Sequence, residues 1–266
     1  MAEPRYTHGH HESVLRSHSW RTAENSAAYL LPELGHGQSL LDVGCGPGTI
    51  TVDLARLVAP GRVVGIEPGG AVLDRARRVA AEAGIEVRFE LGDIYRLAEP
   101  DASFDVVHAH QVLQHLSDPV EALRQMRRLC ARGGVVAARD ADYAAMTWYP
   151  RIPALDRWLD LYQQVARVNG GEPDAGRRLL AWARAAGFAQ VRPSASVWCY
   201  ATPSDRSWWG GMWADRIVSS ALAEQAVTAG LATPGELQEL SNGWREWAAD
   251  PDGWFTVLNG EVLCRG

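Results

Sequence analysis

The stretch LLDVGCGPGT at residues 40–49 carries the strongest structural signal in this 266-residue chain. Its apolar beginning is typical of a buried strand, and the glycines Gly44, Gly46 and Gly48 stand between that strand and a helical pattern. Glycine permits positive φ and lets the backbone approach a ligand closely, while a helix N-terminus offers free N–H groups. Dinucleotide-binding loops are spaced G-x-G-x-x-G, whereas this chain has Thr49 where the third glycine would stand. The stretch therefore predicts a strand, a ligand-binding glycine turn and a helix.

Apolar runs alternate with helical patterns from this stretch to about residue 142. Such alternation is typical of a parallel sheet whose strands are joined by right-handed crossover helices. We expect a Rossmann-like α/β fold, with a mostly parallel sheet and helices on both faces. The expected strands are 39–43, 62–66, 86–90, 104–109 and 134–139, and the expected helices are 49–57, 71–83 and 119–130.

The alternation stops after Asp142. Thr202 and Thr233 each precede a proline and have an acidic residue three positions later, which is the capping-box pattern at a helix start. The chain closes on an apolar stretch that predicts a strand, or a hairpin around Asn259-Gly260. The other expected elements are helices at about 144–170, 174–186, 204–229 and 234–248, a strand at 190–201 and an amphipathic helical segment within 10–31.

These patterns divide a single domain into four parts. They are an N-terminal helical lid at 1–36, a Rossmann-like cofactor-binding core at 37–143, a helical insertion with a crossover helix at 144–186, and terminal strands with an inserted helical cap at 187–266.

Composition excludes several functions. All 26 basic residues are arginine, which removes Schiff-base and phosphate-loop lysine chemistry. The net charge of -6 argues against a nucleic-acid partner, because phosphate neutralisation dominates such binding. No apolar run is long enough for a membrane span and the N-terminus does not resemble a signal peptide, so we expect a cytoplasmic protein. The four cysteines have no zinc-ligand spacing, and we expect no metal.

Two acidic residues follow the next two expected strands. Glu67 ends the strand in RVVGIE, and a carboxylate there can accept hydrogen bonds from both hydroxyls of a ribose. Asp93 follows VRFELG, where a carboxylate can accept from an adenine amino group. A binding site for a nicotinamide dinucleotide would account for Glu67 but would assign no role to Asp93. Each acidic residue alone is typical of an ordinary charged residue at a strand end. Because both follow the glycine loop at successive strand ends, together they indicate a nucleoside ligand.

With these features the chain resembles the class I S-adenosylmethionine-dependent methyltransferases, and within them the ubiquinone/menaquinone C-methyltransferase-like group. The matching pieces are VGCGPG (43–48), GIEP (65–68), GDI (92–94), FDVVHAHQVLQHLSDP (104–119) and RRLCARGGVVAARD (127–140). The resemblance implies a seven-stranded sheet with the last strand antiparallel, S-adenosyl-L-methionine as cofactor and a methyltransferase activity. It also implies the cofactor-contacting residues, which are Gly44, Cys45, Gly46 and Gly48 beside the methionine half, Glu67 with Pro68 at the ribose, Asp93 with Ile94 at the adenine, and Ala109, His110 and Gln111 after the fourth strand.

The acceptor should lie where the methyl group is delivered, at the carboxyl ends of the strands. The candidates for a catalytic role are His110 and His115 after the fourth strand and Asp142 and Tyr143 after the fifth. Histidine exchanges protons near pH 7, so either histidine is a candidate base. A core position for His110, a metal pair with His108, and a structural role for His115 are the competing interpretations.

The N-terminus and the tryptophans complete the hypothesis. Residues 6–11 hold one tyrosine and three histidines, which form either a loose terminus or part of a lid, and Arg21 could then pair with the cofactor carboxylate. Ten of the 11 tryptophans lie at or after Trp148, as core residues or as walls for a small apolar or aromatic acceptor of secondary or quinone/terpenoid-type metabolism.

Other functions remain open at this point. The alternatives are a cyclase or other non-methylating enzyme that binds S-adenosylmethionine, a nicotinamide oxidoreductase, and a methyltransferase of nucleic acid or protein. Methylation could be directed to carbon or to oxygen. Exchange of the lid between subunits would make a homodimer.

Overall fold

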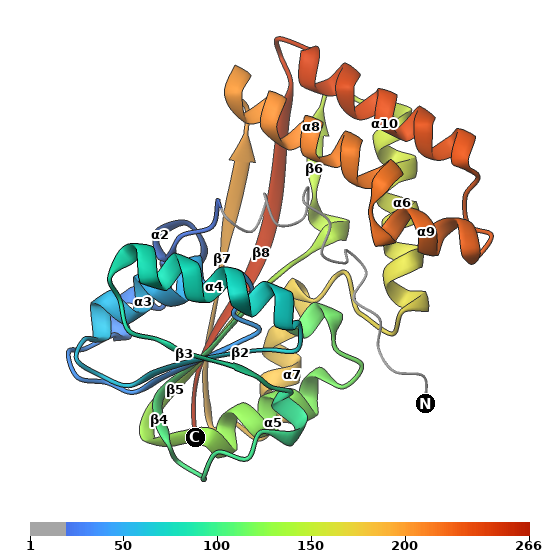
Figure 1. The fold of residues 1–266 in the computed structure, drawn as a ribbon. Coiled ribbons are helices and arrows are strands. Elements are labelled where there is room, and N and C mark those ends of the chain that lie inside the picture. The colour runs from blue at the N-terminus through green and yellow to red at the C-terminus, as the bar shows by residue number, and fades with distance from the viewer. Residues whose placement is uncertain (1–19) are drawn as a thin grey trace.

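The computed structural model describes residues 20–266, and an eight-stranded mixed sheet organises them (Figure 1). The strand order is β3-β2-β1-β4-β5-β8, β7 pairs along the other edge of β8, and β6 pairs with β8 beyond the end of β5. Strands β1 to β5 are parallel, while β8 is antiparallel to all its neighbours. The predicted Rossmann-like fold is confirmed, with one strand more than expected. The strands are β1 (Leu40–Val43), β2 (Val63–Glu67), β3 (Arg88–Leu91), β4 (Phe104–His110), β5 (Cys130–Ala141), β6 (Thr147–Tyr149), β7 (Gln190–Tyr200) and β8 (Trp254–Arg265).

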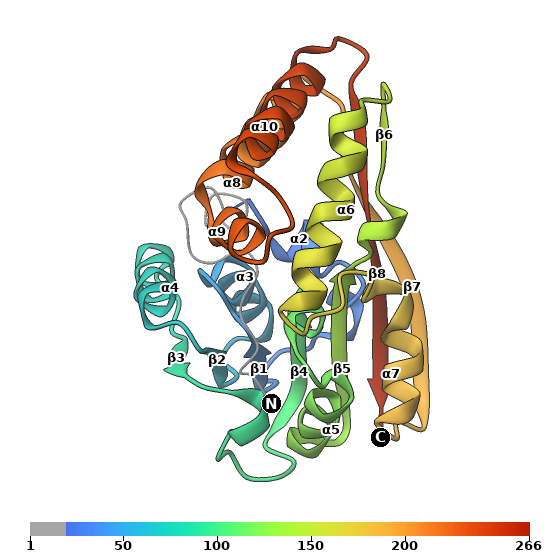
Figure 2. The ribbon, with the colours of Figure 1, turned by 90° about the vertical axis from the view of Figure 1, so that its right-hand side faces the viewer.

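Helices cover both faces of this sheet (Figure 2). Leu40 packs against residues of α2 and α3, and the next residue, Leu41, packs against α5 and α7 on the opposite face. Because both faces are covered, the parallel strands are apolar along their whole length. The helices are α2 (Ala23–Ser26), α3 (Thr49–Val58), α4 (Gly70–Ala83), α5 (Pro119–Leu129), α6 (Pro153–Val168), α7 (Leu179–Ala185), α8 (Pro203–Ser219), α9 (Ala221–Thr228) and α10 (Pro234–Ala249), with short 3-10 turns η1 (Leu31–Glu33), η2 (Ile94–Arg96), η3 (Leu113–His115), η4 (Tyr143–Ala145) and η5 (Gly176–Arg178).

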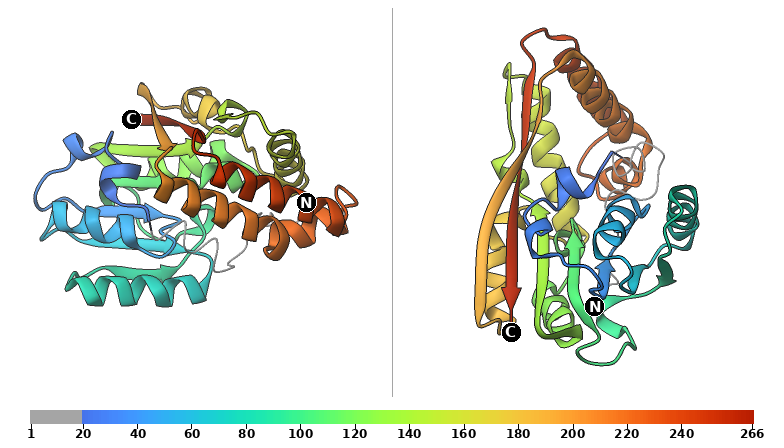
Figure 3. Two further views of the ribbon diagram at one scale, coloured as in Figure 1. Left: turned by 90° about the horizontal axis from the view of Figure 1, so that it is seen from above. Right: turned by 90° about the vertical axis from the view of Figure 1, so that its left-hand side faces the viewer.

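A second hydrophobic core lies beyond the parallel part of the sheet. Strands β7 and β8 run as a pair out of the parallel core toward the helical cap (Figure 3). Helices α6, α8, α9 and α10 lie against this extension (Figure 1). Phe255 and Val257 of β8 belong to one buried cluster with four fully buried tryptophans. These tryptophans are Trp158, Trp213, Trp244 and Trp247.

The C-terminal half differs from its prediction in three places. Of the two alternatives for the chain end, the strand is confirmed and the hairpin at Asn259-Gly260 is wrong, because β8 is one continuous strand that pairs with β5 on one side and β7 on the other. The expected helix at 204–229 divides at Ser220, whose backbone is extended. The expected helix at 144–170 begins only at Pro153, after η4 and β6. Strand pairing overrides the local pattern at β8 and at β6, and Pro153 sets the start of α6, whereas the break at Ser220 lies at neither a paired strand nor a proline.

Other expectations of local structure are confirmed. Thr202 and Thr233 both form capping boxes, with Asp205 and Glu236 as their partners. Of the expected N-terminal helical segment, the described part holds only α2, and the histidine cluster of the proposed lid lies outside the described residues. Within 20–266, no helix combines the length and the hydrophobicity that a bilayer span requires.

Candidate active site

A cavity of about 770 Å³ lies at the carboxyl ends of β1, β2, β4 and β5. One part, which we call the loop half, is lined by the turns after β1, β2 and β3, with Gly44, Cys45, Gly46, Glu67, Pro68, Asp93 and Ile94. The other part, the aromatic half, is lined from η4, β7 and α8 by Tyr143, Met146, Trp198, Tyr200, Trp208, Trp209, Trp213 and Arg216. The cavity is also lined by residues at and after the end of β4, which lies between β1 and β5 in the sheet. These residues are His110, Gln111 and His115.

The glycine turn brings backbone against the cavity at positions where a side chain does not fit. Gly44 has a φ of +67°, and a Cβ on it would lie 2.5 Å from Cγ2 of Val112. Gly48 caps α3 with a φ of +81°, and a Cβ there would lie 2.9 Å from the Cβ of Ala76 and 3.0 Å from Phe89. These glycines are therefore required by conformation and by packing alike.

The strand-end acids border this turn. Glu67 accepts hydrogen bonds from the backbone N–H groups of Gly46, at 3.2 Å, and Gly69, at 3.3 Å. Burial raises the pKa of Glu67, although these two hydrogen bonds oppose the rise. Asp93 is exposed and caps η2 by accepting from the N–H of Tyr95 at 3.0 Å. Both carboxylates thus lie at the cavity wall within reach of a bound ligand.

Gln111 joins three parts of the chain at the mouth of the aromatic half. It has a φ of +53°, a conformation that non-glycine residues rarely adopt. Its Oε1 accepts from the guanidinium of Arg21, and its Nε2 donates to Asn259 at 3.3 Å. The Arg21 guanidinium also lies 5.6 Å from the ring centre of Trp198, which in turn contacts the ring of His110. Arg21 is thereby fixed over the cavity.

The hydrogen bonds of Gln114 determine the tautomer of His115. The N–H of Ala141 donates to Gln114 Oε1 at 3.2 Å, so the other end of that amide is Nε2. This amide nitrogen can only donate, so it donates a hydrogen bond to Nε2 of His115 at 3.0 Å. The ring nitrogen Nε2 is therefore an acceptor, and the proton of the neutral ring is on Nδ1. Burial and the positive charge of Arg21 lower the pKa of His115 to about 3. His115 is therefore a neutral donor at Nδ1, and its basic nitrogen is already occupied.

The buried turn structure behind the cavity depends on Asp140. This carboxyl is fully buried and accepts from the N–H of Gln114 at 3.1 Å, at the start of the turn that carries His115. Burial raises the pKa of Asp140 to about 7, and the backbone hydrogen bonds oppose that rise.

Comparison with known proteins assigns this arrangement to a family. A sequence model described as a methyltransferase domain matches residues 34–187. An uncharacterized methyltransferase of Schizosaccharomyces pombe is 35% identical over 97% of this chain and 95% of its own length. The chain is a member of the S-adenosylmethionine-dependent methyltransferase family. The resemblance found in the sequence motifs is thus confirmed.

More distant relatives of the methyltransferase agree with this assignment. The 27-O-demethylrifamycin SV methyltransferase of Amycolatopsis mediterranei is 35% identical over 65% of this chain and 68% of its own. The crystal structure of the YcgJ protein of Bacillus subtilis aligns with a TM-score of 0.59 at 20% identity, over 91% of this chain and 98% of that one. This last similarity shows the common fold.

Three predicted site residues of the methyltransferase do not line the cavity. Ala109 is fully buried in the sheet core, and Gly48 lies behind the glycine turn at the start of α3. Asp142 is turned away, with both carboxylate oxygens 2.6 Å from the guanidinium of Arg177. The other predicted residues all line the cavity, whereas His108 is a core residue whose Nδ1 lies 2.8 Å from Asp42. Among residues 20–266 no group of three or more potential metal ligands comes together.

Sequence analysis missed Arg216, which lines the aromatic half from α8. Trp209, Trp213 and Arg216 follow one another at spacings of four and three residues, so they share one face of that helix. That spacing is visible in the sequence, but only the fold shows that this face is turned to the cavity.

Proposed function

We propose that this methyltransferase binds S-adenosyl-L-methionine in the loop half and transfers the methyl group to a small apolar or aromatic acceptor in the aromatic half. The observation that carries the proposal is that both halves belong to one cavity, which spans from the glycine turn to the tryptophans of α8. The acceptor would come from secondary or quinone- and terpenoid-type metabolism, and its methylated atom would be carbon or oxygen. The name of the Amycolatopsis relative, a demethylrifamycin methyltransferase, supports an acceptor of this kind.

The residues of the loop half fit this cofactor. The two oxygens of Glu67 can accept from the ribose hydroxyls, and Asp93 can accept from the adenine amino group, with Pro68 and Ile94 beside them. Gly44 and Gly46 leave room for the methionine half against the backbone. Arg21 would pair with the cofactor carboxylate, since a guanidinium matches the geometry of a planar anion.

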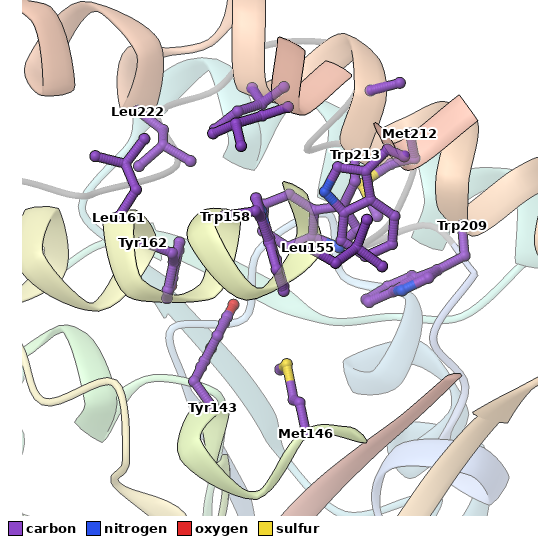
Figure 4. Packing of buried hydrophobic residues seen from close by; sticks show 14 of the residues in the cluster. Tyr143, Met146, Leu155, Trp158, Leu161, Tyr162, Trp209, Met212, Trp213 and Leu222 are labelled. Carbon is purple, nitrogen blue, oxygen red and sulfur yellow. The ribbon is translucent and has the colours of Figure 1, made fainter. Parts of the chain in front are cut away.

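When bound, S-adenosyl-L-methionine supplies a methyl group activated by a positively charged sulfur. The task left to the protein is to hold the acceptor in line and to exclude water. Tyr143, Met146 and the tryptophans of β7 and α8 provide apolar walls, and Figure 4 shows Tyr143 and Met146 pointing toward α6 and α8. His110 and the Nδ1–H of His115 would orient the acceptor rather than deprotonate it, because the His115 base nitrogen accepts from Gln114.

Two measurements test the proposal. Calorimetry should show binding of S-adenosyl-L-methionine and S-adenosylhomocysteine but not of NADH. A panel of phenols and naphthols incubated with the cofactor labelled in its methyl group should give labelled product. Absence of cofactor binding would refute the proposal. Cofactor binding without label transfer to any acceptor class would instead favour the non-methylating alternative.

A further inference from the structure

The carboxylates of the cavity gather in one part of it. Five carboxylates line it, and all come from the strand ends and loops of the loop half or from the start of α5: Asp42, Glu67, Asp93, Asp118 and Glu121. Among the described residues, no carboxylate lines the aromatic half, where Arg216 stands, while Arg96 of η2 lines the loop half and Arg21 lies near Trp198. A ligand that lies across the cavity therefore meets the five carboxylates at one end and Arg216 at the other.

Arg216 is held at the wall of the aromatic half by its place on α8. The residue is 4% exposed, and its guanidinium carbon lies 4.6 Å from the ring centre of Trp213, on the same helix face. Removing a charge from water is costly unless an opposite charge or a ring face compensates it. A guanidinium has five N–H donors in a fixed fork, so it can hold an anionic oxygen in addition to its contacts within the protein.

The charge of Arg216 acts on the interior of this half. Burial raises the pKa of Tyr143, whereas a hydrogen bond with Tyr162 and the positive charges of Arg216 and Arg21 oppose the rise. The Tyr143 ring stacks on Tyr162 with centres 4.0 Å apart, and Tyr143 and Arg216 both line the aromatic half. The two arginines favour a negative charge at this hydroxyl, although burial outweighs them and the pKa of Tyr143 is raised overall.

We propose that the aromatic half binds an aromatic acceptor in its anionic form, with Arg216 holding a charged oxygen of that acceptor. The inference rests on the proposed function above, because it places the acceptor opposite a cofactor in the loop half. The class comprises phenolates, enolates and aromatic carboxylates. Their shared feature is a flat apolar ring system, which the tryptophans cover, bearing one negative oxygen.

An ionised acceptor simplifies the transfer. The electron pair of the acceptor oxygen, or of a carbon conjugated with it, forms the new bond to the methyl carbon. The bond from that carbon to sulfur breaks, and its electron pair stays on sulfur, so the opposite charges of donor and acceptor disappear together. Oxygen methylation then requires no proton transfer to the protein. In carbon methylation the neutral dienone formed first regains its aromatic ring when the proton on the methylated carbon passes to solvent water and the ring oxygen takes up a proton or stays charged. This agrees with a His115 whose basic nitrogen is occupied.

The test compares two probes that differ in charge and hardly in shape. The protein saturated with S-adenosylhomocysteine is titrated near neutral pH with 2-naphthoate and with 2-naphthamide in a calorimeter. Wild type should bind the carboxylate about 10- to 100-fold more tightly than the amide, the range of a charge-assisted hydrogen bond. Arg216→Gln should reduce this preference to within about 3-fold, and Arg216→Lys should keep part of it. Arg245→Gln, which changes an exposed arginine on α10 outside the cavity, is the matched control and should keep the preference.

Each outcome decides the matter. Equal binding of acid and amide by wild type overturns the inference without any variant, as does failure of both probes to bind at millimolar concentration. A preference that persists in Arg216→Gln also overturns the role of Arg216. S-adenosylhomocysteine binding is measured first in every sample, so loss of the proposed function is distinguished from loss of the anion preference.

Discussion

The two halves of the cavity are built in different ways. The loop half consists of backbone and strand-end side chains, each only a few residues from the strand that positions it. The aromatic half is assembled from η4, β7 and α8, which are joined by the extension of β8 and by buried tryptophans. The family match at 34–187 includes the whole loop half but ends before β7 and α8. The half proposed to bind the cofactor is thus built from local sequence, and the half proposed to select the acceptor depends on long-range packing.

The largest expected effect is on the free energy of unfolding, through the glycine turn of the loop half. Gly48→Ala should lower the free energy of unfolding by about 2–5 kcal/mol, because a left-handed residue and an overpacked contact with Ala76 and Phe89 add their costs. Gly84 is the matched control, since its φ is +65° and a Cβ at this position would have no atom within 4 Å. Gly84→Ala should cost only about 1–2 kcal/mol. Urea unfolding measures both variants, and equal losses would show that packing behind the turn does not matter.

Protonation at the boundary between the halves should have the next largest effect. His115 has a pKa of about 3 in the fold, against 6.5 ordinarily, so between these values the unfolded chain binds a proton that the folded chain does not. The contribution of His115 to stability should therefore fall as the pH is lowered below ~6, by at most about 1.4 kcal/mol for each pH unit. His115→Asn should remove this dependence in unfolding experiments across that range.

The pKa shift of Asp140 changes stability with pH in the opposite direction. Its pKa of about 7 lies above the ordinary 3.8, so its contribution to stability is complete at low pH and is lost as the pH rises through 7. The variant Asp140→Asn isolates that contribution.

The His115 prediction has its own contradicting outcome. If the stabilities of His115→Asn and wild type change with pH in parallel, the assigned neutral state of His115 is wrong.

Cofactor affinity tests the loop half alone. Glu67→Ala should weaken S-adenosyl-L-methionine binding by about 1–3 kcal/mol, the range for lost hydrogen bonds to a charged group. Glu82→Gln, an exposed acid on α4, should leave the affinity unchanged in the same calorimetric titration. Unchanged affinity in Glu67→Ala would remove this residue from the ribose site.

The smallest effect is expected from the two histidines after β4. If the acceptor reacts as an anion, the single variants His110→Ala and His115→Ala and the double variant should each lose less than ~10-fold in turnover, with no limb lost from the pH profile. Turnover against pH, with cofactor binding followed separately, gives the answer. A loss of ~10²–10⁴-fold would restore one of them as a general base.

The parallel core and its turn could be predicted because their determinants are local. The apolar run at 40–43, the glycines that follow and the acids at the ends of β2 and β3 are contiguous signals for a strand, a left-handed turn and a strand-end ligand. The capping boxes at Thr202 and Thr233 are equally local and equally predictable. The pattern at Asn259-Gly260 left a strand and a hairpin open, and pairing on both edges of β8 decides for the extended strand against the local turn preference.

The Rossmann-like core, the glycine turn and the residues that border it are encoded in the sequence alone, because each depends on neighbours a few positions away. The tertiary structure was needed to show that Asp142 pairs with Arg177, that His115 carries its proton on Nδ1, and that Arg216 lines the aromatic half together with Tyr143. These properties depend on a backbone N–H from β5, a guanidinium from η5 and a helix face on α8. Long-range packing determines these three properties, and that packing cannot be inferred from the spacing of residues along the chain.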